Sequence, residues 1–333
     1  MLEKPDIQEQ LIITCVLDEY CLHASELTFL PLGVDVNAAV YRLVTDGETY
    51  FLKLRRGEFD EMTLAVPQFL KSQGIAHILA PLPTQERRMW GRVEDYRMIL
   101  YPFIEGKDGY EVTLPDRQWI ELGESLQAVH TAQVPLHLRR IIRQETYSPQ
   151  YRQTVRKFQA QVENTNFDDP VSARLAAFMR DKRSQISRIV ERGDQLGLEL
   201  QNRELEFVLC HSDLHAGNLL ITAEGDFYIV DWDSPILAPK ECDLMFAGAG
   251  MSSSWPGNRE AQLFYQGYGP VQVDPMALAY YRYERITQDI AAFCEEIFLS
   301  GEGEEDRQQA YHYLTSNFLP GHLVEIAFES DRF

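Results

Sequence analysis

The sequence changes character near Tyr101, and this change limits the folds that the chain can adopt. Before it, β-branched and aromatic residues gather in short runs such as NAAVYRLV (37–44) and TYFLKL (49–54), and the Asp-Gly pair between these two runs is typical of a β-hairpin. After it, most apolar residues recur at helical spacing. The pattern predicts an α+β chain with a small antiparallel-sheet lobe, 1–101, and a larger, mainly helical lobe, 102–333.

Within this frame the order of elements can be predicted. In the first lobe a helix that contains Pro67 is expected over 58–73, and two strands over 87–103. In the second lobe the residues that share a helix face are Trp119, Leu122, Leu126 and Val129. Two helices are expected over 150–196, and further helices from Glu241 onward. Between them lies a strand-rich segment made of EFVLC (206–210), NLLIT (218–222) and FYIVDWD (227–233).

Charge and cysteine content narrow the class of protein. Thirty-one basic and 51 acidic residues give a formal charge of −20, which repels nucleic acids and anionic membranes and attracts cationic small molecules. The five cysteines are scattered without a C-x-x-C pair, so neither a disulfide framework nor a thiolate zinc site is expected. No stretch is as apolar as a membrane helix, and no signal peptide is evident. We expect a cytoplasmic protein, as a monomer or a homodimer.

Polar residues concentrate where the strand-rich segment begins and ends. Asp213 follows the first strand, Asn218 opens the second, and Asp231 closes the third. A tight turn between the last two strands brings their open ends together, so Asn218 and Asp231 should be close neighbours. An amide and carboxylates are oxygen ligands of the kind that Mg²⁺ prefers, often together with phosphate oxygens. The segment therefore predicts a magnesium site.

The same residues match a known motif. HSDLHAGN (211–218) fits H-x-D-L-x-x-x-N, the catalytic loop of kinase-fold phosphotransferases, and Asp231 stands where that fold carries its metal-binding aspartate. Lys53, on an expected strand, stands where the fold keeps its phosphate-binding lysine. Protein kinases have arginine at the position of Ser212, and no A-P-E element is present. Over nearly its whole length the chain instead resembles the aminoglycoside phosphotransferase family of small-molecule kinases.

The resemblance implies a bilobal, protein-kinase-like fold that uses ATP or GTP with Mg²⁺. Asn218 and Asp231 would hold the metal ion. Lys53 would contact the α- and β-phosphates, with Glu61 as its partner. The remaining nucleotide contacts would come from the loop and linker residues Gly33, Asp35, Asn37, Leu100, Tyr101 and Phe103. Asp243 would stabilise the catalytic loop.

The resemblance also implies the reaction. Asp213 would orient the acceptor hydroxyl and take its proton. The acceptor would be a hydroxyl of an aminoglycoside or an aminocyclitol such as spectinomycin, which makes antibiotic resistance the expected role. Residues expected near a cationic substrate are Asp213, Trp232, Asp233, Glu284 and Asp289. Arg285 and Asp289 are also spaced as a helical ion pair.

Other functions remain open on the residues alone. Relatives of this architecture phosphorylate choline, homoserine and sugars, and Asp213 would serve any of these hydroxyls. A metal-dependent hydrolase could use His211, Asp213 and His215 as ligands, but it leaves Lys53 and Asp231 without a role. A kinase-like scaffold without activity would often have lost one of the motif residues, and all of them are present.

Overall fold

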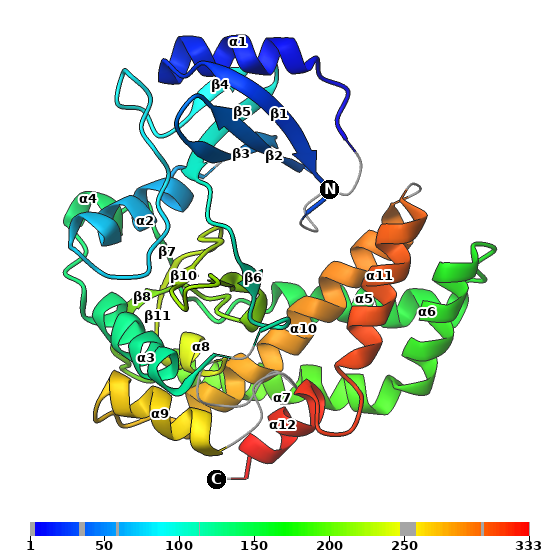
Figure 1. Cartoon of the computed structure of the whole chain (residues 1–333). Coiled ribbons are helices and arrows are strands. Elements are labelled where there is room, and N and C mark those ends of the chain that lie inside the picture. Colours follow the sequence, from blue (N-terminus) through cyan, green and yellow to red (C-terminus); the bar gives the residue numbers. More distant parts are fainter. Residues whose placement is uncertain are drawn as a thin grey trace. The chain divides into compact units, whose positions relative to one another are not determined.

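The computed structural model describes residues 4–32, 37–57, 60–112, 114–246, 258–300 and 303–332 (Figure 1). The chain forms two compact units. The first comprises Met1–Gln118, Ala132–Ile142 and Gly217–Pro235, and the second comprises Trp119–Thr131, Arg143–Ala216 and Ile236–Phe333. The first unit thus takes in the 217–235 segment as well as the N-terminal sheet. The lobe boundary expected near Tyr101 stays a prediction.

A five-stranded antiparallel sheet forms the main layer of the first unit. Its strand order is β1-β2-β3-β5-β4, with β1 (Ala24–Leu30), β2 (Ala38–Thr45), β3 (Thr49–Arg56), β4 (Gly91–Val93) and β5 (Tyr96–Pro102). The β2–β3 hairpin forms as expected, since the amide of Thr45 donates to the carbonyl of Glu48 at 2.9 Å. Alternate side chains of β2, β3 and β5 pack into one core that includes Tyr41, Leu52 and Leu100.

Within its described residues, the first unit also contains three helices. They are α1 (Glu9–Tyr20), α2 (Met62–Ser72) and α4 (Leu136–Arg139). Helix α1 lies along the sheet (Figure 1). Its side chains Ile12 and Val16 are buried in the sheet core. Helix α2 is shorter than the predicted 58–73 and continues through Pro67. The segment after α2 joins the unit's second sheet, because the amide of Ile229 donates to the carbonyl of His77 at 2.7 Å.

The second sheet has three short strands in the order β10-β9-β6, with β6 (Lys107–Asp108), β9 (Leu219–Ile221) and β10 (Phe227–Ile229). The register pairs Ile229 with Leu219 and Phe227 with Ile221, which confirms the predicted hairpin. The ring of His77 stacks on Phe227 with centroids 4.0 Å apart. This packing fixes the hairpin relative to the N-terminal elements of the same unit.

The second unit is helical around α10 (Pro275–Leu299), whose buried residues include Ile286, Ile290 and Ile297. Helix α3 (Asp116–Thr131) enters this unit from the first and buries the face that the sequence predicts. The other helices are α5 (Gln150–Asn164), α6 (Pro170–Asp181), α7 (Arg183–Gln201), α8 (Glu241–Leu244), α9 (Asn258–Tyr268), α11 (Glu304–Ser316) and α12 (Leu323–Ser330), with η1 (Ala216–Asn218) at the junction of the units.

Two details of this unit differ from the sequence prediction. Residues 150–196 contribute to three helices, because a further break at Lys182 separates α6 from α7. The strand β8 (Val208–Cys210) pairs with β11 (Ile236–Ala238), which in turn pairs with β7 (Arg143–Gln144). The sequence does not mark β7 and β11, because strands of two or three residues show too little periodicity by themselves and these two have no tight turn between them like the one that marks β9 and β10.

All five cysteines are free thiols. Among the helices of the described residues, none is both long enough and apolar enough to cross a membrane.

Candidate active site

The β9–β10 hairpin brings Asn218 and Asp231 together, as the sequence predicts. One step beyond the last paired residues, the amide of Val230 donates to the carbonyl of Asn218 at 3.0 Å, and Asp231 follows directly. Asn218 is buried, whereas the side chain of Asp231 is 47% exposed. The backbone of Asp231 has φ +62°, a left-handed conformation in which a residue other than glycine is uncommon. Strand β10 ends two residues earlier, at Ile229, and the chain turns at Asp231.

Lys53 lies in the middle of β3, where it pairs with Val40 on one side and Ile99 on the other. Its ammonium nitrogen is 3.0 Å from Asp233 Oδ2 and 3.7 Å from Asp231 Oδ1. Burial alone would lower the pKa of Lys53, but the two aspartates raise it above its usual value. The lysine is therefore a fixed cation beside the end of the hairpin.

A cavity of about 390 Å³ lies beside this lysine within the first unit. Its walls are mostly apolar, and Lys53, Asn218, Asp231 and Asp233 provide polar groups. The remaining lining residues are Leu32, Ala38, Val40, Phe51, Pro67, Leu79, Tyr101, Pro102, Ile104, Gly217, Leu220, Val230 and Trp232. Such a cavity suits a ligand with a flat apolar part and a charged part.

The predicted linker contributes only in part to this cavity. Tyr101 lines it, whereas the side chain of Leu100 points to the opposite face of β5 and is fully buried in the sheet core. Phe103 is not among the lining residues and packs instead against the guanidinium of Arg42, 5.5 Å from the ring centroid. Ile104, which the sequence does not single out, does line the cavity. Because side chains alternate along β5, Leu100 and Tyr101 point to opposite faces of the sheet.

The loop residues and the helix glutamate have different outcomes. Gly33 and Asp35 lie outside the described residues. Asn37 is exposed, and its carbonyl accepts a hydrogen bond from the amide of Arg56 at 2.9 Å. Glu61 is exposed just before α2, and within the described residues it forms no ion pair with Lys53. The predicted pair is therefore corrected, because Asp233 and Asp231 neutralise the lysine instead.

In the second unit, Asp243 holds the catalytic loop. Its carboxylate accepts hydrogen bonds from the amides of His211 at 2.8 Å and Ser212 at 2.7 Å, one on each oxygen. The ring of His130 contacts the same carboxylate at 3.0 Å and the hydroxyl of Tyr268 at 2.7 Å. These contacts hold the backbone of Ser212 at φ +71° directly before Asp213.

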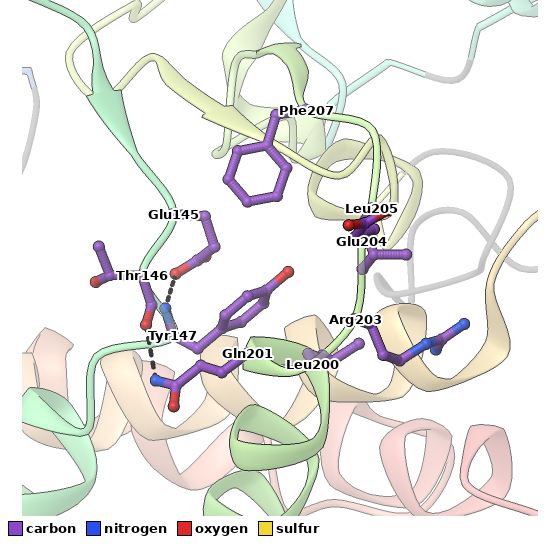
Figure 2. A pocket seen from close by; sticks show the side chains of 9 residues that line it. All are labelled: Glu145, Thr146, Tyr147, Leu200, Gln201, Arg203, Glu204, Leu205 and Phe207. Carbon is purple, nitrogen blue, oxygen red and sulfur yellow. Dashed lines mark hydrogen bonds between the residues drawn. The ribbon is translucent and has the colours of Figure 1, made fainter.

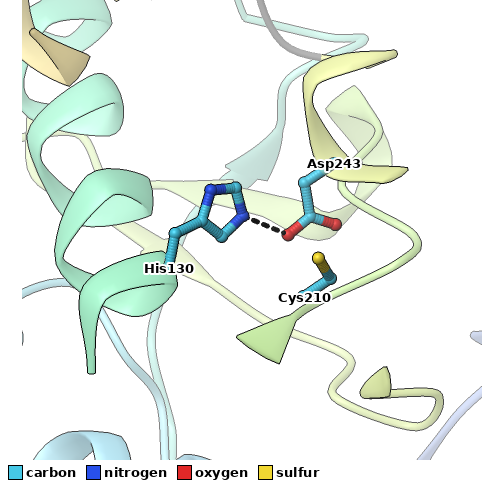
Figure 3. A group of neighbouring side chains, drawn as sticks. All are labelled: His130, Cys210 and Asp243. Carbon is cyan, nitrogen blue, oxygen red and sulfur yellow. Dashed lines mark hydrogen bonds and ion pairs between the residues drawn. The ribbon is translucent and has the colours of Figure 1, made fainter. Parts of the chain in front are cut away.

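His130, Asp243 and Cys210 lie close enough together to suggest a metal site (Figure 3). Burial raises the pKa of Cys210 well above its usual value, which disfavours the thiolate that a metal would need. Both oxygens of Asp243 already accept hydrogen bonds from the loop. The cluster is best explained as support for the catalytic loop. His211, Asp213 and His215 form no such group among the described residues.

Asp213 lies against Arg285 of α10, with an ion pair between Oδ1 and the guanidinium. His215 Nε2 is 3.7 Å from Oδ2. Burial alone would raise the pKa of Asp213, but Arg285, followed by His215 and His211, brings it below its ordinary value. Asp213 is therefore an anion at neutral pH. Its sequence distance from Arg285 explains why sequence reasoning did not pair the two.

Two predicted substrate residues of α10 have different surroundings. Asp289 forms the expected helical ion pair with Arg285, at 3.0 Å, and its side chain is 15% exposed. Glu284 is buried and forms an ion pair with Arg152 of α5, so the prediction that it grips a cationic substrate is corrected. Burial raises the pKa of Glu284 to about 7, against the opposing effect of Arg152.

The other two predicted substrate residues, Trp232 and Asp233, line the cavity of the first unit. The indole nitrogen of Trp232 donates to the carbonyl of Ile229 at 3.2 Å. Asp233 accepts hydrogen bonds from Lys53 and from Arg55, each at 3.0 Å. Arg55 was not predicted as a site residue. Its place two residues after Lys53, on the same strand face, is the signal that could have identified it.

A second hollow, of about 440 Å³, lies in the second unit (Figure 2). It is lined by Glu145, Thr146, Tyr147, Leu200, Gln201, Arg203, Glu204, Leu205 and Phe207. The amide of Tyr147 donates to Glu145 at 2.6 Å, and Gln201 donates to the carbonyl of Thr146 at 2.9 Å (Figure 2). Arg203 forms an ion pair with Asp274. These contacts shape the local backbone, and no motif residue lies among the lining residues.

Comparison with known proteins agrees with this arrangement. Residues 28–281 match the model of the phosphotransferase enzyme family APH. The chain belongs to this family. It is a phosphotransferase that acts on a hydroxyl group, and the metal-dependent hydrolase has no support. Comparison with curated protein sequences gives no match.

Solved structures of spectinomycin phosphotransferase APH(9)-Ia are similar over the full length of both chains. The complex with ADP and spectinomycin is 37% identical, with a TM-score of 0.92, and covers 99% of this chain and 100% of that one. The AMP-bound complex is 35% identical, with a TM-score of 0.87, and covers 98% and 100%. Choline kinase LicA from Streptococcus pneumoniae is 14% identical, with a TM-score of 0.57 and coverage of 92% and 97%, and shows the fold alone. The kinase-like α+β fold predicted from the motifs is confirmed.

Proposed function

We propose that this phosphotransferase transfers the γ-phosphoryl group of ATP or GTP to a hydroxyl of an aminocyclitol or aminoglycoside antibiotic, with spectinomycin as the first candidate, and so confers resistance. The full-length similarity to spectinomycin phosphotransferase, at 37% identity, carries the proposal. The charge of −20 supports it, because such an acceptor is a cation at neutral pH.

The cavity beside Lys53 is the proposed nucleotide site. Its apolar walls would contact the nucleobase, and the ammonium group of Lys53 would contact the phosphates. Lys53 now neutralises Asp233 and Asp231, at 3.0 and 3.7 Å. A phosphate would compete with these carboxylates for the ammonium group of Lys53. The carboxylate oxygens that it displaces would then be free to bind a metal ion. Nucleotide and metal binding should therefore support each other.

The residues at the hairpin end fit Mg²⁺. Asn218 supplies an amide oxygen, and Asp231 supplies a carboxylate that is 47% exposed and displayed at a strand end. The bound ion would neutralise charge on the phosphate oxygens. To bind the ion, Asp231 would turn away from Lys53, and the phosphates would take its place beside the ammonium group.

Asp213 is the proposed base. Its carboxylate would accept a hydrogen bond from the acceptor hydroxyl and orient that oxygen toward the γ-phosphorus. As the new P–O bond forms and the bond to the leaving nucleoside diphosphate breaks, the hydroxyl proton would pass to Asp213. Because the transition state is largely dissociative, positioning contributes more than basicity. An anionic Asp213 suits this role.

The product mass tests the proposal. Purified protein is incubated with Mg²⁺, ATP or GTP and spectinomycin, with kanamycin, choline and homoserine as alternative acceptors. A single phosphoryl group gained by spectinomycin, and not in the Asp213→Asn variant, is expected. Phosphorylation of choline or homoserine alone would reject the antibiotic acceptor and keep the chemistry. Bacteria that express the protein should also grow at higher spectinomycin concentrations than those that express Asp213→Asn.

A further inference from the structure

Arg285 lies between two carboxylates in the second unit. Its Nη1 contacts Asp213 Oδ1, and its Nε is 3.0 Å from Asp289 Oδ1. Arg285 and Asp289 lie one turn apart on α10, while Asp213 belongs to the catalytic loop. The guanidinium thus bridges a rigid helix and the proposed base.

Arg285 is itself held in place from several directions. The side-chain amide of Asn317, after the end of α11, donates to Asp289 Oδ2 at 3.0 Å. The ring of Phe246 lies under the guanidinium, 5.3 Å from its central carbon to the ring centroid. The side chain of Arg285 is 22% exposed. A guanidinium with two carboxylates and an aromatic face around it has few alternative rotamers, so its position is defined by the fold.

Among the described residues, the charged and titratable groups around Asp213 come from α10, from the catalytic loop and from α8, which provides the Cys242 thiol. Helix α10 provides Arg285 and Asp289, and the catalytic loop provides His211 and His215. Among these groups Arg285 is the permanent cation, and it makes the closest contact with Asp213. An arginine so close to a base reduces its basicity. The presence of Arg285 therefore needs a reason other than proton affinity. A fork-shaped cation that contacts Asp213 and Asp289 at the same time can supply orientation.

We propose that Arg285 is a positioning residue of this enzyme: by holding Oδ1 of Asp213 it directs Oδ2 toward the acceptor hydroxyl, with Asp289 and Asn317 holding Arg285 in turn. The inference rests on the proposed role of Asp213. It adds a residue from a helix 72 positions away to the catalytic apparatus. In a reaction with a dissociative transition state, a well-placed weak base serves better than a stronger base with a variable orientation.

The kinetic test compares Arg285→Gln with Arg285→Lys. In Arg285→Gln we expect kcat to fall about 10- to 100-fold, in line with the effect of a small misplacement of a reacting group, with KM changed by less than about threefold. The acidic limb of the kcat profile should move to higher pH, because the pKa of Asp213 rises. Arg285→Lys keeps the charge, so the limb should stay in place while kcat recovers only in part.

A matched control removes an arginine elsewhere in the same unit. Arg192 forms a two-point ion pair with Asp331, with both distances 2.7 Å, and has no contact with the catalytic loop among the described residues. Arg192→Gln should leave kcat and its pH profile unchanged. An unchanged kcat and acidic limb in Arg285→Gln would overturn the proposal. A loss that appears in KM alone would make Arg285 a substrate-binding residue and would overturn it too.

An acceptor-independent measurement separates this inference from the identity of the substrate. Carbon-13 NMR of aspartate carboxyls, with Asp213 assigned from Asp213→Asn, gives the pKa of Asp213 directly. It should rise in Arg285→Gln and remain near the wild-type value in Arg285→Lys and Arg192→Gln. If wild-type enzyme phosphorylates none of the tested acceptors, the proposed substrate fails, while this titration still decides the contact. An identical pKa of Asp213 in Arg285→Gln would reject it.

Discussion

Two arginine–carboxylate networks meet α10 at adjacent residues, and their surroundings differ. Glu284 pairs with Arg152, whose guanidinium also contacts Asp194 and the carbonyls of Tyr147 and Ser148; the side chain of Arg152 is 2% exposed. Arg285 pairs with Asp213, and these side chains are 22% and 33% exposed. The chemical groups are the same in both networks.

The two networks differ in burial, which decides whether a ligand can reach their charged groups. The Arg152 network ties α5, α7 and α10 together with nearly every hydrogen of the guanidinium engaged, so it can stabilise the fold but offers no surface to a ligand. The Arg285 network is partly open, so a ligand can reach its carboxylate. The comparison therefore predicts opposite outcomes. Loss of the buried cation should reduce stability, and loss of the accessible anion should reduce activity.

The largest effect is expected for Asp213→Asn. Without the base, kcat should fall by about 10² to 10⁴, the usual contribution of a positioned general base. Affinity for Mg–ATP should remain within about threefold, and the denaturation midpoint should change little, because Asp213 is partly exposed. Steady-state kinetics and nucleotide titration check this. A kcat near wild type would remove Asp213 from its proposed role.

Arg152→Met should have the converse effect. It leaves Glu284 buried without its cation, and removal of one partner from a buried pair typically costs about 3–5 kcal/mol in free energy of unfolding. The folded fraction should retain kcat within about threefold. Urea denaturation with assays on the same samples measures both, and Arg192→Gln, a more exposed pair, should cost about 1 kcal/mol or less. Lost activity at unchanged stability would reverse the assignment of the two networks.

Asp289→Asn should have a moderate effect. It tests whether Asp289 acts through Arg285 in the partly exposed network that Arg285 forms with Asp213 and Asp289. Arg285 keeps its contact with Asp213 but loses one charge-assisted hydrogen bond. If that bond contributes to catalysis only through the position of Arg285, kcat should fall by up to roughly tenfold, the equivalent of about 1.4 kcal/mol. KM for the acceptor should stay constant. A rise in KM with constant kcat would instead support direct contact between Asp289 and the cationic substrate.

The smallest effect is expected outside both networks, at the N-cap of α6. Asp169 accepts a hydrogen bond from the amide of Ser172 at 2.8 Å and pairs with Arg307. Asp169→Ala should reduce the free energy of unfolding by about 1 kcal/mol and leave activity unchanged. Measurement by urea denaturation at several pH values would show both results.

The pH dependence of that contribution follows from its sign. The hydrogen bond to Ser172 and the contact with Arg307 lower the pKa of Asp169 to about 2 from the ordinary 3.8. The unfolded chain thus binds more protons than the folded chain between these values. The stabilising contribution is present above about pH 4 and is lost as pH falls toward 2. Wild type and Asp169→Ala should converge in stability there.

The sequence by itself determined the elements and the order of the motif. The Asp-Gly turn, the β-branched and aromatic runs of β2 and β3 and the apolar face of α3 are local patterns, and each was found as predicted. The closeness of Asn218 and Asp231 also followed from local geometry, because a tight hairpin leaves only one way to pair its strands. The proposed roles of Lys53 in phosphate binding and of Asp213 as the base also come from the sequence, because the motif spacing is short and linear.

Only the tertiary structure decided which charges meet. Lys53 pairs with Asp233, 180 residues away, and not with Glu61; Arg285 reaches Asp213 across 72 residues. Along a helix, successive side chains point about 100° apart. Glu284 therefore turns into the packed core beside Arg152, and Arg285 turns to the catalytic loop. The sequence shows two neighbouring charged residues. The way α10 packs against its neighbours places Glu284 in the core and Arg285 beside Asp213.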